Sequence, residues 1–279
     1  MPHYASTYIF VNDFSAVKED QPSYTPPVSP DSFDVSSFLL QAQAVKGRCY
    51  VITFSPSHNL TLADLPHSSI FNIINTWTAL YTSHLPSSHP YFSPAPPELG
   101  VIPPKEQYTY LQIFENKGAA MGCSNPHPHG QAWCITGLPS EISTELRNLR
   151  EYKTSHSGRG LLADYVALEL QKKDRIVFAN MTWVALCPWW AVWPFEILVI
   201  PKREVPSLPA LTLEEQQGLA EVISQVTRRY DNLFETQFPY SMGIHQAPLS
   251  GDGEEDAHLH IHFYPPLLRS ATVKKFLVG

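Results

Sequence analysis

Closely spaced histidines are the side chains in this sequence best suited to chemistry. His127 and His129 lie two residues apart in the segment His127-Pro128-His129-Gly130-Gln131, so on an extended backbone both imidazoles project to the same side. Pro126 and Pro128 restrict the backbone φ angle and remove two hydrogen-bond donors, which stiffens the segment. One imidazole could bind a metal ion while the other acts as a nucleophile on a substrate. A pair of surface histidines in a proline-rich loop is the alternative.

A second histidine group lies close to the end of the sequence. His258, His260 and His262 alternate with apolar residues and would share one face of a predicted strand. Three buried imidazoles are costly unless they bind something, and metal coordination is the usual solution. His245 stands 15 residues upstream of His260 and could join them. The alternative is a solvated histidine-rich edge strand. The other histidines lie in polar or proline-rich surroundings and are expected to be solvated: His3, His67, His84, His89 and His156.

Glycines flank the first histidine pair at Gly118, Gly122 and Gly130. A residue without a side chain lets backbone N–H groups come close to an anion, as loops that hold phosphate require. The segment from Gly118 to Gln131 therefore predicts a site for a phosphorylated substrate.

The composition argues against two classes of binding partner, nucleic acids and membranes. The chain has 279 residues, of which 43% are hydrophobic, and a net charge of −7, so it can form a core and lacks the basic excess typical of nucleic-acid binding. Its 4 cysteines form no Cys-x-x-Cys pair, which favours free thiols in a reducing compartment. The apolar segment 183–200 is interrupted by Pro188, Pro194 and Glu196. We therefore expect a cytoplasmic protein that binds neither nucleic acid nor membrane.

The hydrophobic pattern predicts the strands and helices that hold these residues. Helical spacing predicts two core helices, one after an N-cap at Asp64 with Pro66 in its first turn, and one after Thr212, which forms a capping box with Glu215. Two further helices are expected at 141–152 and 161–170. Runs of aromatic and β-branched residues predict strands at 7–11, 48–54, 108–114, 131–135, 182–186, 195–200 and 258–264.

The order of these elements repeats along the chain. A strand, a core helix, a strand and the first histidine group are followed by the same order in the second half, where the segment 240–245 precedes the second group. The repeat predicts an α+β fold made by internal duplication, with a mostly antiparallel sheet and flanking helices. We expect one domain at 1–139, carrying His127 and His129, and a second at 140–279.

Five segments of the sequence together resemble the galactose-1-phosphate uridylyltransferase family. That family is a doubled member of the histidine-triad superfamily, so the resemblance implies a duplicated histidine-triad fold. The similarity runs through nearly the whole chain, interrupted at proline-rich loops. The segments are Tyr8–Phe14, Phe114–Trp133, Tyr230–Phe234, Phe238–Gly243 and His262–Val273.

The resemblance implies a nucleotidyltransferase of galactose metabolism. His129 would attack the α-phosphate of UDP-glucose, forming a covalent uridylyl-histidine and releasing glucose 1-phosphate. Galactose 1-phosphate would then take the uridylyl group and leave as UDP-galactose. Imidazole suits this role because it is a good nucleophile at neutral pH and a good leaving group once phosphorylated. Gln131 would donate its amide to a phosphate oxygen. Asn12 and Asp13 match positions that hold the uridine nucleotide, and the nucleotide or sugar-phosphate site is matched by Asn116, Gly122, Cys123, Ser124, Lys275 and Phe276.

The resemblance also implies two metal sites and a homodimer. His58 and His127 match two ligands of a zinc site that the family completes with an upstream Cys-x-x-Cys pair, which this sequence lacks, so we expect zinc to be bound weakly there. The second metal site would hold iron or zinc. Its ligand types suit both metals and do not decide between them. Its four matched ligands are Glu145, His245, His260 and His262.

Two other functions are compatible with these residues. The sequence starts after the family's zinc cysteines and stops before its last substrate residues, which suggests a chain truncated at both ends. A truncated, non-catalytic paralogue that binds metal or nucleotide is therefore one alternative. A dinucleotide phosphorylase of the same superfamily is the other, although the segment Gly122-Cys123-Ser124-Asn125 and the complete second metal set favour the transferase.

Overall fold

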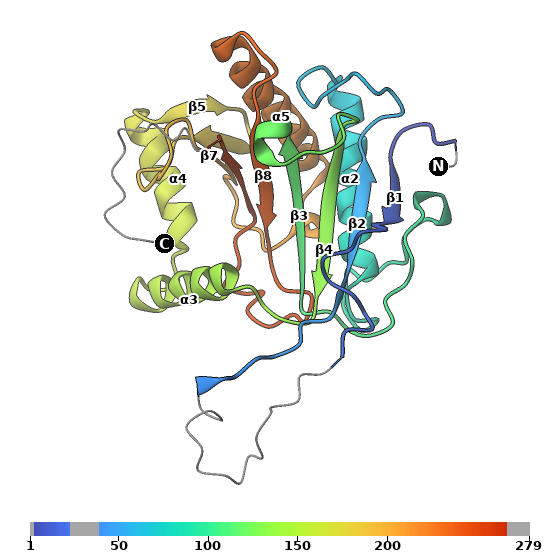
Figure 1. Cartoon of the computed structure of the whole chain (residues 1–279). Helices are drawn as coiled ribbons and strands as arrows, with labels where there is room; N and C mark the ends of the chain where they lie inside the picture. Colours follow the sequence, from blue (N-terminus) through green and yellow to red (C-terminus); the bar gives the residue numbers. More distant parts are fainter. Residues whose placement is uncertain (1–2, 23–38, 267–279) are drawn as a thin grey trace.

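The computed structural model describes residues 3–22 and 39–266, and within them the chain forms one nine-stranded sheet (Figure 1). The strand order is β1-β2-β4-β3-β8-β9-β7-β6-β5, and all neighbours are antiparallel. The strands are β1 (Tyr8–Val11), β2 (Gly47–Thr53), β3 (Tyr110–Lys117), β4 (His129–Ile135), β5 (Ile176–Ala179), β6 (Trp183–Leu186), β7 (Ile197–Pro201), β8 (Tyr240–His245) and β9 (His260–Tyr264).

The sheet is built from two similar halves that meet at its centre. Reading outward from the central β3–β8 pair gives β3, β4, β2 and β1 on one side and β8, β9, β7 and β6 on the other. In each half a long helix precedes the last two strands along the chain, α2 (His67–Ser83) before β3 and β4, and α5 (Leu213–Phe234) before β8 and β9. The predicted α+β class, with a duplicated antiparallel sheet and flanking helices, is confirmed.

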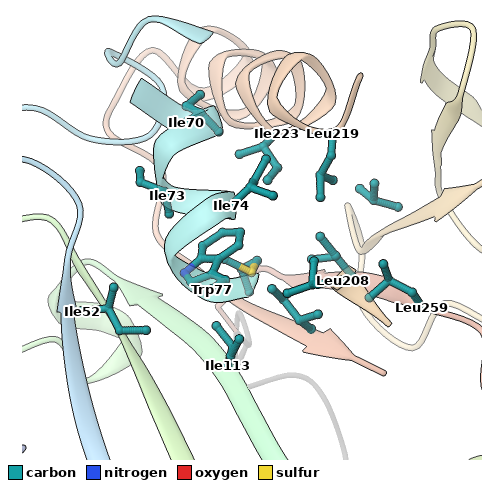
Figure 2. Close-up of a cluster of buried hydrophobic side chains, with 14 of the residues drawn as sticks. Ile52, Ile70, Ile73, Ile74, Trp77, Ile113, Leu208, Leu219, Ile223 and Leu259 are labelled. Carbon is teal, nitrogen blue, oxygen red and sulfur yellow. The ribbon is translucent and has the colours of Figure 1, made fainter. Parts of the chain in front are cut away.

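Helices α2 and α5 pack side by side on one face of the sheet (Figure 1). Figure 2 shows Trp77 of α2 between the two helices and the strands, close to Ile113 of β3 and Ile223 of α5, and all three side chains are fully buried. Both helices bury apolar residues at helical spacing, which is why the sequence pattern located them.

The opposite face is covered by helices mainly over the second half of the sheet, although α3 also buries Tyr110 at the start of β3. Leu149 of α3 (Ser140–Ser155) and Val166 of α4 (Leu161–Lys172) pack against Leu198 and the other side chains that β6 and β7 turn to this face. Strand β7 is therefore buried along its whole length, whereas β4 alternates between buried and partly exposed residues. In the described part of the chain this leaves the first half open around the start of β4, on the face away from α2 and α5.

Three local expectations need correction or confirmation. Asp64 does not cap α2: its carboxylate accepts from the backbone and hydroxyl of Thr61, and Pro66 occupies the N-cap position without a side-chain bond. The capping box between Thr212 and Glu215 is confirmed. His84 is fully buried rather than solvated, because its ring caps the end of α2. Strand β5 was not predicted.

Among the helices of the described residues, none combines the length and the apolar character needed to span a membrane.

Candidate active site

Strand β4 presents His129 and Gln131 on the open face of the sheet. Both side chains are partly exposed, while Gly130 between them is buried toward the helices. A side chain at Gly130 would not fit, because a Cβ there would lie 2.8 Å from Cζ of Phe54 and 3.0 Å from the carbonyl oxygen of Phe114. The glycine thus lets the neighbouring strands close around the histidine.

The backbone orients the ring of His129. Its Nδ1 lies 2.7 Å from the carbonyl oxygen of His127. A carbonyl oxygen only accepts, so Nδ1 carries the proton and Nε2 of the neutral ring keeps a free lone pair. The carbonyl oxygen of Pro128 accepts from the N–H of Phe54 at 3.0 Å, which fixes the backbone before the strand. His129 therefore has the geometry of a nucleophile.

Two cavities meet at His129. The first, of about 720 Å³, lies over β1, β2 and β4, and the second, of about 330 Å³, lies at the end of β3. Both are lined by His129, His127, Ser124 and Asn125. A molecule that reached from one cavity to the other would pass the ring of His129. The geometry suits a substrate with a bond to be broken between two bulky parts.

His58 and His127 come together, but as a hydrogen-bonded pair. Their Nδ1 atoms are 2.7 Å apart, and the hydroxyl of Tyr4 lies 3.1 Å from Nε2 of His127. Tetrahedral zinc with Zn–N bonds of about 2.0–2.1 Å would hold two nitrogens roughly 3.3 Å apart, so the rings must separate to share an ion. Burial, and then the nearby His58 ring, lowers the pKa of His127. Among the described residues no His, Cys, Asp or Glu joins them to make a group of three.

The second set of predicted ligands forms a compact group. One ligand atom from each of Glu145, His245, His260 and His262 lies within 4.8 Å of all the others. The Glu145 carboxylate is 2.8 Å from Nδ1 of His245 and 3.4 Å from Nε2 of His260. Although burial raises the pKa of Glu145, the two imidazoles outweigh it and hold this pKa well below the usual range. Three nitrogens and one carboxylate are a donor set that suits iron or zinc.

Comparisons with known proteins agree with this geometry. The family models for the N-terminal and C-terminal domains of galactose-1-phosphate uridyl transferase match residues 1–139 and 145–279. The chain belongs to the galactose-1-phosphate uridylyltransferase family. It is 58% identical to the Hypocrea jecorina galactose-1-phosphate uridylyltransferase, over 100% of this chain and 74% of that relative. It is 47% identical to the Haemophilus influenzae protein of the same name, over 100% of this chain and 71% of that relative.

A solved structure of a uridylyltransferase has the same fold. Its TM-score is 0.74 at 27% identity, and the alignment covers 93% of this chain and 74% of that one. The likeness supports the duplicated histidine-triad architecture implied by the sequence.

The structure brings most of the residues expected from the uridylyltransferase resemblance to these cavities. Asn12 and Gln131 line the first cavity, Asn116 and Cys123 line the second, and Ser124 lines both. Asp13 and Gly122 are exposed and line neither cavity. Lys275 and Phe276 lie outside the described residues.

Several lining residues were missed by the sequence analysis. Tyr4 and Phe10 lie on either side of Tyr8 in a stack with ring centroids 5.8 and 6.4 Å apart, and both line the first cavity. The aromatic residues at positions 4, 8 and 10 were the signal that could have indicated a surface for a planar base. Thr61 and Gln237 of the second cavity gave no such signal, because they come from distant loops.

Proposed function

We propose that this chain transfers a uridylyl group from UDP-glucose to galactose 1-phosphate by way of a covalent uridylyl-His129. The observation that carries the proposal is the free Nε2 of His129 at the junction of two cavities, with Nδ1 held by the carbonyl oxygen of His127. Family membership and the level of identity to proteins named galactose-1-phosphate uridylyltransferase support it.

The first step is a displacement at the α-phosphorus. The lone pair of Nε2 forms the N–P bond, and the P–O bond to glucose 1-phosphate breaks with its electron pair leaving on the phosphate oxygen. The imidazole becomes positively charged while Nδ1 keeps its proton, and the carbonyl oxygen of His127 stabilises that charge through the hydrogen bond. Phosphate is a good leaving group, so no proton has to be supplied to it.

The second step reverses the chemistry with another sugar phosphate. A phosphate oxygen of galactose 1-phosphate attacks the phosphorus, the N–P bond breaks, and Nε2 recovers its lone pair. The amide of Gln131 would donate to a non-bridging phosphate oxygen in both steps and lower the cost of the developing charge. Asn12 would hold the uridine side of the substrate, and the sugar-phosphate side would lie near Asn116, Cys123 and Ser124.

The metal group has a structural place in this proposal. Glu145, His245, His260 and His262 would hold one iron or zinc ion, which would tie α3 to β8 and β9. A bound ion there would neutralise the negative charge of the carboxylate in this group. His58 and His127 would bind zinc more weakly. We also propose that the protein is a cytoplasmic homodimer. Size-exclusion chromatography with light scattering would test the dimer, and cell fractionation would test the location. The two halves of each chain would divide near Pro139.

The test is to trap the covalent intermediate. Incubation with UDP-glucose labelled in its α-phosphate should label the protein, and peptide mapping should locate the label at His129. His129→Gly should abolish labelling and transfer without unfolding the protein, since the residue makes no metal bond in this proposal. Added imidazole should restore part of the reaction with UDP-glucose. The matched control His156→Gly, an exposed histidine at the end of α3, should label normally. Label on another residue, or undiminished transfer by His129→Gly, would rule out the mechanism.

A further inference from the structure

An ion pair between a buried lysine and a partly exposed aspartate anchors the segment that connects β3 to β4. Strand β3 ends at Lys117, and the following residues 118–126, here named the phosphate loop, lead to His127 and His129. The Lys117 side chain is only 8% exposed, and its Nζ donates to both carboxylate oxygens of Asp231, at 2.9 and 3.1 Å. Asp231 belongs to α5, in the other half of the chain. The base of the phosphate loop is therefore fastened to the second half.

The Asp231 carboxylate also holds a third group. Its Oδ1 accepts from the N–H of Phe238 at 2.8 Å, in the segment between α5 and β8. The ring of Tyr240 at the start of β8 lies 5.5 Å from Nζ of Lys117. One carboxylate thus fixes β3, the last turns of α5 and the approach to β8 relative to one another. Two bonds to a charged lysine and one to a backbone donor are charge-assisted and therefore strong.

The phosphate loop depends on the residue next to Lys117. The carbonyl oxygen of Gly118 accepts from the N–H groups of Met121 and Cys123, at 3.0 and 3.3 Å. Gly118 has a positive φ of 87°, and a Cβ there would lie 2.9 Å from Cβ of Pro239, so it is packed closely against the same segment. A displacement of Lys117 would therefore move Gly118 and, with it, the backbone of Cys123.

We propose that Lys117 and Asp231 are positioning residues that hold the phosphate loop against His129. Cys123 and Ser124 of this loop line the cavity that His129 also lines. A buried charge that loses its partner moves toward water or admits water, so neutralising either residue should loosen the loop. The expected loss of rate rests on the proposed transfer function, but the expected loosening of the loop does not.

The experiment measures the loop and the reaction separately. Cys123 is partly exposed, so its alkylation by iodoacetamide, followed peptide by peptide, reports the loop, and Cys187 serves as the internal reference. In Asp231→Asn, which keeps an oxygen for the N–H of Phe238, alkylation of Cys123 should be roughly tenfold faster because the loop opens locally more often. Uridylylation of His129 should be on the order of 100-fold slower, since misplaced groups at a reacting centre lose much of their effect. The Michaelis constant should change much less.

A matched control exists on the same helix. Glu215 of α5 is also a carboxylate paired with a cation, 2.6 Å from Arg203, but far from the loop in the fold. Glu215→Gln should leave both the Cys123 alkylation rate and the uridylylation rate at wild-type values. Lys117→Met is the second variant. It removes the lysine charge, while Asp231 keeps its bond to Phe238. If Asp231→Asn does not fold, Lys117→Met tests the anchoring role instead.

Each outcome bears on one of the two proposals. Cys123 that reacts at the wild-type rate in folded Asp231→Asn or Lys117→Met would overturn the anchoring role, whether or not transfer slows. Faster Cys123 alkylation together with slower transfer supports it. Faster alkylation in the variants of a protein whose wild type transfers no uridylyl group would support the anchor and refute the proposed function instead.

Discussion

Replacing Glu115 with glutamine should make protein stability less dependent on pH between about pH 5 and pH 8. The Glu115 side chain is 4% exposed, points toward the helices from β3, and accepts a hydrogen bond from the hydroxyl of Tyr240 at 2.8 Å. The charged groups around it are Lys117 on the same strand and Asp231 on α5. Glutamine keeps the size of the side chain and an oxygen for the Tyr240 hydroxyl, so the substitution removes ionisation and little else.

The expected magnitude comes from the pKa of the buried carboxyl. Burial raises the pKa of Glu115 from 4.5 to about 7, although Tyr240 and Lys117 oppose the rise. Between these two values the folded protein holds a proton that the unfolded chain has lost, so stability falls as pH rises through this window and is constant above it. A pKa difference of about 2.5 between the two states corresponds to about 3 kcal/mol. Wild type should lose this amount from about pH 5 to pH 8 relative to Glu115→Gln.

Urea unfolding at several pH values measures this difference directly. Other groups titrate in both proteins, so only the change in stability between wild type and Glu115→Gln is compared. Glu215→Gln is the control, because the hydrogen bond from Arg203 lowers the pKa of Glu215 and moves its titration below the window. Equal pH slopes for wild type and Glu115→Gln would show that Glu115 is ionised throughout, and the reasoning from burial would then be wrong.

Three further changes test the metal group, a helix cap and the core. Glu145→Ala should lower the content of tightly bound metal from about one ion per chain toward zero, whereas Glu141→Ala, one turn earlier on α3, should not, as elemental analysis would show. Thr212→Ala should cost about 1 kcal/mol in denaturant unfolding because it removes the capping box of α5. Trp77→Ala should cost about 3–5 kcal/mol in the same assay, since it leaves a cavity between α2, α5 and the sheet. A loss below about 1 kcal/mol for Trp77→Ala would show that the core collapses into the space.

The sequence predicted features that near neighbours in the chain determine. Apolar spacing located α2 and α5, and the capping box of Thr212 and Glu215 needs only four consecutive residues. The alternation of His260 and His262 along β9 likewise depends on strand geometry alone. The chemistry assigned to these histidines depended on resemblance, because spacing by itself left metal binding, catalysis and solvation open.

Features that depend on distant partners could not be predicted. His84 was expected at the surface, yet its ring nitrogens are hydrogen-bonded to the carbonyl oxygen of Leu80 and the hydroxyl of Tyr50. Tyr50 is 34 residues away in the sequence. Lys117 and Asp231 are 114 residues apart, and neither is notable among the charged residues of the sequence. Strand β5 has only partly buried or exposed residues and so lacks the apolar alternation that marks a half-buried strand.

The two halves place the same histidine geometry in different surroundings. Nδ1 of His129 donates to the carbonyl oxygen two residues back, and Nδ1 of His260 does the same to His258, each at 2.7 Å, so each ring turns its Nε2 away from the backbone. In the second half α3 covers this face and brings Glu145 next to His260, which makes a compact donor group for a metal ion. In the first half the described residues place no α-helix over His129, and its Nε2 remains open to two cavities. What covers the strand, rather than the spacing of the histidines, therefore separates the proposed nucleophile from the proposed metal ligand.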